Sequence, residues 1–259
     1  MAYISLRSVH KTYPNGYCAL KDINLDIESG LFIAVLGPSG AGKSTLLRVM
    51  NALDPATQGE ISIDGVVLNK KNYRQMRAHI GMVFQQFNLV DRLNVMTNVL
   101  VGRLAERSWL SSLFYLFPKT DYQIAEAALR EVDLLEKAWS RADKLSGGQQ
   151  QRVGIARALA QQPKMILADE PIASLDPKAS EEVLKLLRKI CSEKGITVIV
   201  NLHQVEYAKQ FADRVIALKS GQVVFDGHPD ALTQARQAEI YGTILEETTD
   251  DYELVLAHA

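Results

Sequence analysis

Alternating apolar and polar positions open the chain and predict two half-buried strands. The segments 4–13 and 19–27 both alternate in this way, which places every second side chain on one face of a sheet. The segment 31–36 is apolar throughout and lies between Gly30 and Gly37, which is typical of a strand buried on both faces of a parallel sheet. We therefore expect an N-terminal β lobe followed by the first strand of a buried sheet.

The second half of the chain alternates buried strands with amphipathic helices. Three apolar runs of strand length predict strands at 165–168, 197–202 and 215–218. The segments 177–193 and 205–212, which lie between these runs, have helical periodicity. This rhythm is typical of βαβ units in a mostly parallel sheet.

Helical patterns dominate the middle of the chain, and we expect a helical subdomain at about residues 88–160, inserted into an α/β core. Residues 1–245 are expected to form a single domain, and residues 246–259 an acidic C-terminal tail. The segment 102–119 contains an apolar and aromatic cluster made of Trp109, Leu110, Leu113, Phe114, Leu116 and Phe117. Local core packing explains this cluster, and a groove for a helix of a membrane partner is the alternative.

Composition lowers the expectation for several classes of protein. Lys and Arg total 29 and Asp and Glu 30, so the net charge of −1 gives no electrostatic footprint for nucleic acid, and we expect no nucleic-acid partner. A local basic patch within this balanced total is the alternative. Cys18 and Cys191 match no metal or redox spacing and are interpreted as reduced thiols. No apolar run approaches the roughly 18–20 residues that span a bilayer. We expect a soluble chain, without a secretory signal at 1–9, that reaches a membrane only through a partner.

A glycine-rich loop lies between the strand at 31–36 and a helical segment at 43–52. It reads Gly37-Pro38-Ser39-Gly40-Ala41-Gly42-Lys43-Ser44, with Thr45 next in the chain, and it fits the pattern G-x-x-x-x-G-K-[ST]. Glycines let successive amides point at an anion, and the following helix adds its dipole. Lys43 would reach the β- and γ-phosphates and Ser44 would ligate Mg²⁺. The loop therefore predicts binding of ATP with Mg²⁺.

Two adjacent acids, Asp169 and Glu170, follow the apolar run 165–168. They are expected at the carboxyl edge of the sheet, where α/β folds bind ligands. Because side chains alternate along a strand, the two acids cannot do the same job. Asp169 is the candidate for holding Mg²⁺ through its water shell, and Glu170 for orienting or deprotonating an attacking water. Alone the pair also suits a structural role, but beside a phosphate loop it predicts ATP hydrolysis.

A second glycine pair precedes another helical segment, at 151–160. It belongs to the run Leu145-Ser146-Gly147-Gly148-Gln149, and a glycine pair before a helix N-terminus is another anion-binding geometry. One nucleotide does not need two such loops, but two copies of the chain arranged head-to-tail would use both. Ser146 and the amides of Gly147 and Gly148 would then bind the γ-phosphate held by the other copy.

In this order the motifs resemble those of the ATP-binding cassette (ABC) family over nearly the whole chain. The resemblance implies a P-loop NTPase fold with a mostly parallel central sheet, an antiparallel N-terminal β lobe and an inserted helical subdomain. It also implies that Tyr13 stacks on adenine and that Gln85 contacts Mg²⁺ and takes part in catalysis with Lys43. A strand-edge role for Tyr13, and Gln86 in place of Gln85, stay open.

Two further residues receive roles through the same resemblance. Asp176, in Ser174-Leu175-Asp176, resembles the residue that contacts the opposite subunit. His203, after the run 197–202, resembles the switch histidine that binds the γ-phosphate during catalysis, and a structural role at a strand end is the alternative.

Within this family the chain resembles the ATP-binding subunits of phosphonate importers, in the loop 169–177, the switch region 201–205 and the insertion 102–119. The resemblance implies a homodimer at the cytoplasmic face of the bacterial inner membrane, which powers import through separate permease subunits. A solute-binding protein would be an indirect partner. Importers of phosphate, phosphite or organophosphate are alternatives. The alternatives from other functional classes are a soluble accessory subunit of a phosphonate-degrading complex, a DNA-repair or translation ATPase, and a regulatory nucleotide binder.

Overall fold

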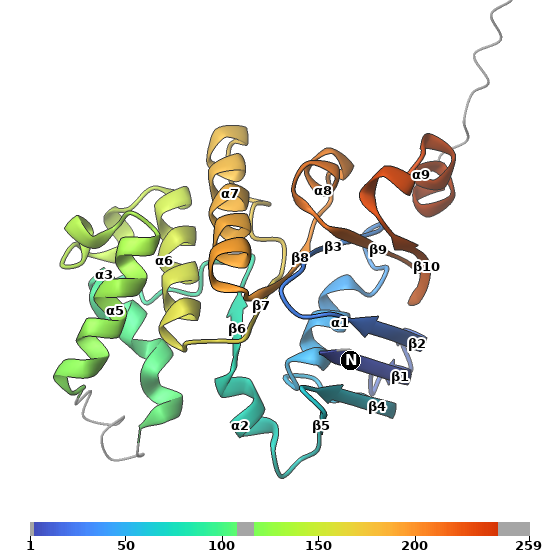
Figure 1. The fold of residues 1–259 in the computed structure, drawn as a ribbon, viewed down its shortest axis with the longest axis horizontal. Coiled ribbons are helices and arrows are strands. Elements are labelled where there is room, and N and C mark those ends of the chain that lie inside the picture. The colour runs from blue at the N-terminus through green and yellow to red at the C-terminus, as the bar shows by residue number, and fades with distance from the viewer. Residues whose placement is uncertain (1–2, 108–116, 243–259) are drawn as a thin grey trace, which may run out of the picture.

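Two β-sheets and the helices around them make up the fold in the computed structural model, which describes residues 3–107 and 117–242 (Figure 1). The strands are β1 (Ile4–Thr12), β2 (Cys18–Ile27), β3 (Phe32–Leu36), β4 (Gln58–Ile63), β5 (Val66–Val67), β6 (Ile80–Val83), β7 (Met165–Ala168), β8 (Thr197–Asn201), β9 (Arg214–Lys219) and β10 (Gln222–Gly227). The helices are α1 (Lys43–Met50), α2 (Tyr73–Ala78), α3 (Val95–Leu100), α5 (Lys119–Glu131), α6 (Gly147–Ala160), α7 (Pro177–Lys194), α8 (Val205–Phe211) and α9 (Gln234–Tyr241). Short 3-10 helices are η1 (Val101–Glu106), η2 (Leu135–Lys137), η3 (Ala142–Lys144) and η4 (Pro229–Ala231).

The larger sheet runs in the order β10-β9-β3-β8-β7-β6. Its strands are parallel except β10, which pairs antiparallel with β9 at one edge. Every residue of β3, β6, β7 and β8 is buried, and the apolar runs at 31–36, 165–168 and 197–202 predicted this for β3, β7 and β8. The predicted α/β fold with a mostly parallel central sheet is confirmed.

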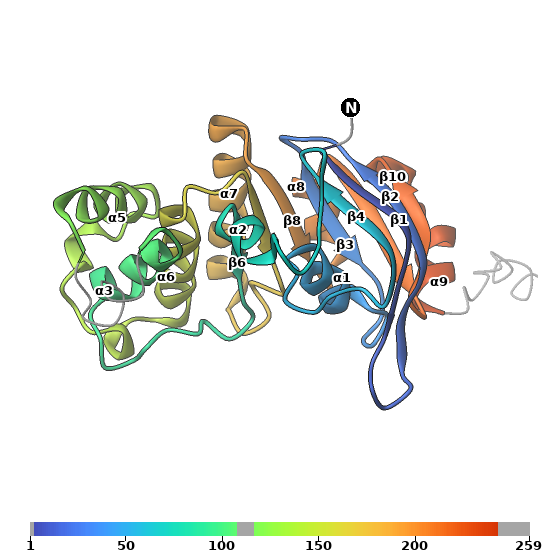
Figure 2. The same cartoon turned by 90° about the horizontal axis from the view of Figure 1, so that it is seen from below.

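The smaller sheet contains the N-terminal strands in the order β2-β1-β4-β5, and all of its pairs are antiparallel. Its buried side chains face α1 and the larger sheet, so α1 lies between the two sheets (Figures 1 and 2). Each fully buried aliphatic side chain in this layer contributes roughly 1.5–3 kcal/mol relative to an exposed one. The antiparallel N-terminal lobe is therefore a layer that covers one face of the larger sheet.

Strand β3 shows how the core is divided between the two faces of the larger sheet. Ile33 and Val35 belong to the cluster around α1 and the N-terminal sheet. Phe32, Ala34 and Leu36 belong to the cluster on the other face, where α7 and α8 lie (Figure 1). All side chains of β3 are apolar, and successive ones point to opposite faces of the sheet because the pleat has a period of two residues. The strand therefore contributes to the core on both faces.

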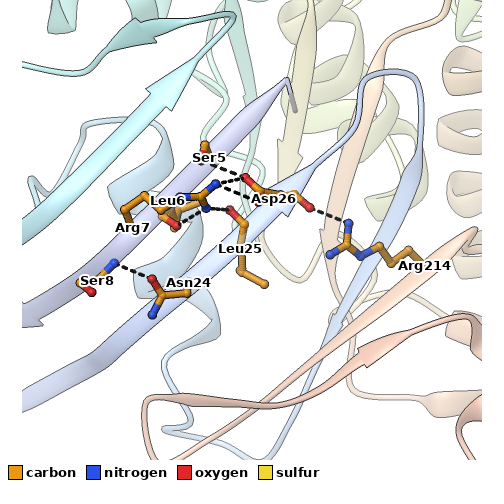
Figure 3. Close-up of polar contacts among 8 residues, drawn as sticks. All are labelled: Ser5, Leu6, Arg7, Ser8, Asn24, Leu25, Asp26 and Arg214. Carbon is orange, nitrogen blue, oxygen red and sulfur yellow. Dashed lines mark hydrogen bonds and ion pairs between the residues drawn. The ribbon is translucent and has the colours of Figure 1, made fainter. Parts of the chain in front are cut away.

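A polar network joins the edge of the N-terminal sheet to β9 (Figure 3). The carboxylate of Asp26 on β2 accepts hydrogen bonds from Arg7 on β1 at 2.7 and 2.8 Å and from Ser5 at 2.9 Å. The backbone oxygen of Asp26 accepts from Nη1 of Arg214 on β9 at 2.7 Å, and Arg214 also pairs with Asp226 on β10. The Arg7–Asp26 pair is half exposed, and solvent screens such surface pairs. The backbone contact from Arg214 is the part of the network that links β2 to β9.

Helices α3, α5 and α6 pack on one another beyond β6, at one end of the molecule (Figures 1 and 2). Asp121 on α5 is fully buried and accepts from Arg103 at 3.1 Å and Arg107 at 2.6 Å. Arg103 also donates to the carbonyl oxygen of Ala160 at the end of α6, so this buried network ties η1 to both helices.

Parts of the sequence predictions fall outside the described residues. Five members of the apolar cluster lie there, namely Trp109, Leu110, Leu113, Phe114 and Leu116, as does the predicted tail at 246–259. Phe117 is described, and it packs partly buried against the core. In the described ranges, none of the helices has the length and apolar character that crossing a membrane requires.

Candidate nucleotide-binding site

The phosphate loop connects β3 to α1, and its backbone requires glycine at several positions. Gly37, Gly40 and Gly42 have φ values of 140°, 76° and 105°, which L side chains rarely adopt. A Cβ on Gly37 would come 2.1 Å from the oxygen of Leu218, and one on Gly42 would come 2.5 Å from the oxygen of Ala19. The backbone of the loop therefore packs closely against the backbone of β9 at Gly37 and of β2 at Gly42, and these two contacts fix the position of the loop.

Lys43 is buried within the phosphate loop, where its ammonium group donates to the carbonyl oxygens of Gly37 at 2.7 Å and Pro38 at 3.1 Å. Burial lowers the pKa of Lys43, and the carboxylates of Glu170 and Asp169 act in the opposite direction. A phosphate bound in the loop would add negative charge beside this ammonium. A cavity of about 220 Å³ adjoins it, lined by residues 39–45 with Tyr17 and Glu170.

Ser44 and Asp169, two of the three predicted magnesium-binding residues, come from distant parts of the chain and are in contact. The Ser44 hydroxyl donates to Oδ1 of Asp169 at 2.8 Å. The same oxygen accepts from Nδ2 of Asn201 at 2.7 Å. Asp169 follows β7, is 8% exposed, and its amide donates to Val83 on β6. Sequence reasoning did not single out Asn201, although a polar residue at the end of a buried strand was a usable signal.

Glu170 and His203 form a second pair at the same edge of the sheet. Nε2 of His203 lies 2.8 Å from Oε1 of Glu170. Glu170 has φ of 49°, an uncommon conformation for a residue other than glycine, and such residues cluster at functional sites. Glu170 lines the phosphate-loop cavity and a second cavity of about 280 Å³ that His203 also lines. Of the four predicted catalytic residues, Glu170 and Lys43 thus line the phosphate-loop cavity, and His203 contacts Glu170.

Tyr13 lies beside the phosphate loop, and a second aromatic ring accompanies it. The Tyr13 hydroxyl donates to Asp54 at 2.9 Å and lies 3.3 Å from the hydroxyl of Thr45. The ring of Tyr17 stacks on Tyr13 at a centroid distance of 6.5 Å, and its hydroxyl donates to the oxygen of Gly40 at 2.9 Å. Tyr17 and Asp54 were not predicted from the sequence. The short spacing between Tyr13 and Tyr17 was a usable signal for Tyr17, and Asp54 had no such signal.

Gln85 follows β6, so its backbone lies next to the end of β7 that carries Asp169. Its side chain is exposed and is not among the residues that line either cavity next to Glu170. The neighbouring Gln86 is exposed as well. The structure therefore places the predicted glutamine near the site without a contact to its other members.

The second glycine motif forms the start of α6. The Ser146 side chain accepts from the Gln149 amide at 3.4 Å, and the Gln149 side chain accepts from the Ser146 amide at 3.1 Å, which is a capping box. Gly147 and Gly148 are the first helical residues, whose amides have no partner within a helix. Asp176 similarly caps α7 by accepting from the Ala179 amide at 3.0 Å.

The phosphate loop and the second glycine motif lie apart within one chain. No residue of 146–149 lines the phosphate-loop cavity. Both views show β6 between α1 and α6 (Figures 1 and 2), and Figure 1 shows β7 there as well. A nucleotide in one chain can therefore meet both motifs only if a second chain supplies one of them.

Comparisons with known proteins identify the class of this chain. The family model described as ABC transporter matches residues 20–173. The chain is 59% identical over 259 residues to the phosphonates import ATP-binding protein PhnC of Thiobacillus denitrificans, covering 100% of both chains. It is 52% identical to PhnC of Bacillus anthracis, over 95% of this chain and 96% of that protein. The chain belongs to the ABC transporter family, and the predicted resemblance to phosphonate-import subunits is confirmed.

Solved structures agree with this assignment. A dimeric ATP-binding cassette in a post-hydrolysis state, bound to ADP and Pi, is 38% identical and superposes with a TM-score of 0.76 over 87% of this chain and 98% of that chain. The cbiO1 cassette of Clostridium perfringens, part of the transporter complex cbiONQ, is 29% identical, with a TM-score of 0.80 over 92% of this chain and 93% of that chain. The chain accordingly has the fold of a nucleotide-binding cassette.

Proposed function

We propose that this chain is the ATP-hydrolysing subunit of a phosphonate importer. The observation that carries the proposal is the Glu170–His203 contact beside the phosphate loop, in a chain similar over its full length to phosphonate-import subunits. In this role the chain binds permease subunits at the cytoplasmic face of the inner membrane, and a solute-binding protein delivers the phosphonate to them.

The residues around Ser44 fit a bound Mg²⁺. Mg²⁺ takes oxygen ligands and is usually held by one or two carboxylates together with substrate phosphates. Ser44 and Asp169 supply a hydroxyl and a nearly buried carboxylate next to the loop, and we infer that Gln85 joins them after the segment following β6 moves inward. When bound, the cation neutralises charge on the β- and γ-phosphates.

The chain's own groups account for hydrolysis in this proposal. The loop amides and the Lys43 ammonium bind the phosphates, and the Lys43 ammonium exchanges the carbonyls of Gly37 and Pro38 for phosphate oxygens. In the structure, Nε2 of His203 lies 2.8 Å from Oε1 of Glu170. If His203 donates to the γ-phosphate instead, Glu170 becomes free to accept a proton from the attacking water. Tyr13 stacks on adenine.

Two chains assemble head-to-tail around two nucleotides. Ser146, Gly147, Gly148 and Gln149 at the N-terminus of α6 bind the γ-phosphate held by the partner, because that terminus offers free amides and a positive dipole. Asp176 lies at the same interface and contacts the partner. ATP therefore stabilises the dimer, and hydrolysis with phosphate release lets it open, which supplies the movement for import.

Glu170→Gln tests the catalytic assignment. The amide cannot accept a proton, so ATP hydrolysis should fall by about 100-fold or more, while ATP still binds and the ATP-bound dimer accumulates. Phosphate release and size-exclusion chromatography with ATP measure the two effects. Glu193→Gln, a change at an exposed residue of α7, is the matched control and should keep wild-type turnover. Hydrolysis that survives Glu170→Gln would contradict the mechanism.

The substrate is tested in the reconstituted complex. The chain is purified with its permease subunits in proteoliposomes, and the solute-binding protein is added empty or loaded with methylphosphonate, phosphate or phosphite. Phosphonate-loaded protein should stimulate ATP hydrolysis most strongly. Stronger stimulation by phosphate or phosphite would assign a different importer. Recovery of the chain in a soluble phosphonate-degrading complex, without permeases, would contradict import.

A further inference from the structure

We propose that Asn201 is a positioning residue for the carboxylate of Asp169, and that it sets the affinity of the nucleotide site for Mg²⁺. The inference rests on the proposed function, because it concerns the same site. Asn201 is the last residue of β8 and is fully buried. β8 pairs in parallel with β7, with Val200 opposite Ala168, so Asn201 and Asp169 come next on neighbouring strands.

Hydrogen-bond chemistry fixes the orientation of the Asn201 amide. An ionised carboxylate only accepts hydrogen bonds, so the side-chain nitrogen of Asn201 must face the Asp169 oxygen 2.7 Å away. Oδ1 of Asp169 therefore receives two donors, one from Asn201 and one from Ser44. With Oδ1 occupied twice, Oδ2 is the oxygen left for the hydration shell of a cation.

The two donors differ in how firmly they are placed. Ser44 is the residue proposed to ligate Mg²⁺, so its hydroxyl serves the cation as well as Asp169. Asn201 lies inside the sheet, where the remaining residues of β8 are all buried. Its donation to Asp169 can therefore persist when the cation binds, and it keeps the carboxylate in one orientation.

The side-chain oxygen of Asn201 indicates that this residue is present for its contact with Asp169 and not for packing in the core. Its oxygen is buried and has no hydrogen-bond partner among the described residues, and such a group is unfavourable. The preceding residues Val198, Ile199 and Val200 are apolar and β-branched, and they pack in the core. A valine at position 201 would avoid the unsatisfied oxygen, but it would remove the donor to Asp169.

Strand β8 supplies a polar partner to each acid that follows β7. Asn201 donates to Asp169, and His203, two residues later, contacts Glu170 at 2.8 Å. The end of β8 therefore holds both the proposed magnesium-binding carboxylate and the proposed catalytic carboxylate. Outer-shell hydrogen bonds of this kind typically change metal affinity by about 10- to 100-fold when they are removed.

The test measures how nucleotide binding depends on free Mg²⁺ in the purified full-length chain. Binding of a fluorescent ADP analogue is titrated in EDTA and at increasing Mg²⁺ for the wild type, Asn201→Val and Asn201→Thr. Valine suits a strand but has no donor, and threonine has nearly the volume of asparagine but a hydroxyl one atom short of the amide nitrogen. Thr197→Val is the matched control, because Thr197 is a buried polar residue at the other end of β8 whose hydroxyl accepts from Gly30.

The Mg²⁺ concentration at half-maximal effect should rise by about 10- to 100-fold in both Asn201 variants. The affinity measured in EDTA should stay within about two-fold, and Thr197→Val should lower only the unfolding temperature. An unchanged Mg²⁺ midpoint in a folded Asn201 variant, an equal shift in Thr197→Val, or failure of both Asn201 variants to fold would overturn the inference. A wild-type chain indifferent to Mg²⁺ would instead contradict the proposed function itself.

Discussion

Asp54 holds Tyr13 in place beside the phosphate loop. Its carboxylate accepts from the Tyr13 hydroxyl at 2.9 Å and from the Lys11 ammonium at 2.9 Å. The same ammonium lies 5.1 Å from the centre of the Tyr13 ring, within the range of a cation–π interaction. The hydrogen bond from Lys11 lowers the pKa of Asp54, burial opposes this shift, and the hydrogen bond from Tyr13 adds to it.

Asp54→Asn should loosen Tyr13 and weaken nucleotide binding a few-fold. It should also lower the free energy of unfolding by about 1 kcal/mol at neutral pH, because a partly exposed charged hydrogen bond is lost. The pKa of Asp54 is below its ordinary value of 3.8, so this stabilisation is complete above that value and is lost as the pH falls through the folded-state pKa. Urea unfolding of both proteins from pH 7 to pH 3 should therefore show a gap that narrows at the acid end.

The control is Asp64→Asn, which removes an exposed ion pair with Lys164. It should leave nucleotide affinity unchanged. A gap between the wild type and Asp54→Asn that widens towards low pH would contradict the predicted sign of the pKa shift.

For single residues, the sequence predicted the site residues that belong to contiguous motifs. It did not predict those whose contacts join segments far apart in the sequence. The glycines and Lys43 occur in one short loop, so their spacing is visible in the chain. Asn201 and Asp54 act through partners 32 and 41 positions away. Such contacts depend on which strands become neighbours, and local patterns do not contain that information.

Helix α6 makes hydrogen bonds to both ends of the segment 84–88, which contains Gln85. Gln151, which is fully buried, donates to the oxygen of Phe84 at 3.5 Å. Arg157 donates to the oxygen of Phe87 at 3.1 Å and to that of Asn88. Because α6 begins at the second glycine motif, a displacement of this segment and a rotation of α6 are mechanically linked.

Arg157→Gln should uncouple α6 from the Gln85 segment. Two carbonyl oxygens lose a charged donor, so the free energy of unfolding should fall by about 1.5–3 kcal/mol. Binding of ADP to the phosphate loop should be unchanged, while ATP hydrolysis should fall by about 10-fold because the two motifs no longer move together. Urea unfolding, ADP titration and phosphate release measure these effects. Arg236→Gln on α9, at an exposed ion pair with Glu239, should change none of them, and unaltered hydrolysis in Arg157→Gln would refute the coupling.

Element bounds were predicted well where local chemistry marks them. The segment predicted at 177–193 is α7, Pro177–Lys194, which begins after the capping carboxylate of Asp176 and ends at Gly195 with φ of 64°. Both signals, the capping aspartate and the glycine, lie directly next to the ends of the helix in the sequence. The position of β3 between β8 and β9 had no such signal, because it follows from packing among segments that are far apart in sequence.

At the scale of the whole molecule, the proposed dimer explains why the chain has two glycine motifs at two separate helix N-termini. The phosphate loop at the start of α1 and the glycine pair at the start of α6 lie apart. A two-fold symmetric pair of chains would place the phosphate loop of each chain against the glycine pair of the other and create two complete sites. The similarity to a cassette solved as a dimer with ADP and Pi supports this arrangement.

Mixing two inactive variants tests this arrangement directly. Lys43→Ala removes the ammonium of the phosphate loop, and Ser146→Arg blocks the α6 terminus, so each variant alone should hydrolyse ATP at background rate. In a mixed dimer, one composite site contains both defects and the other contains none. Random pairing makes about half of the dimers mixed, so an equal mixture should recover about a quarter of wild-type activity if the sites act independently. Each variant alone at doubled concentration is the control. If the second glycine motif served its own chain, every phosphate loop would face a defect and the mixture would stay inactive.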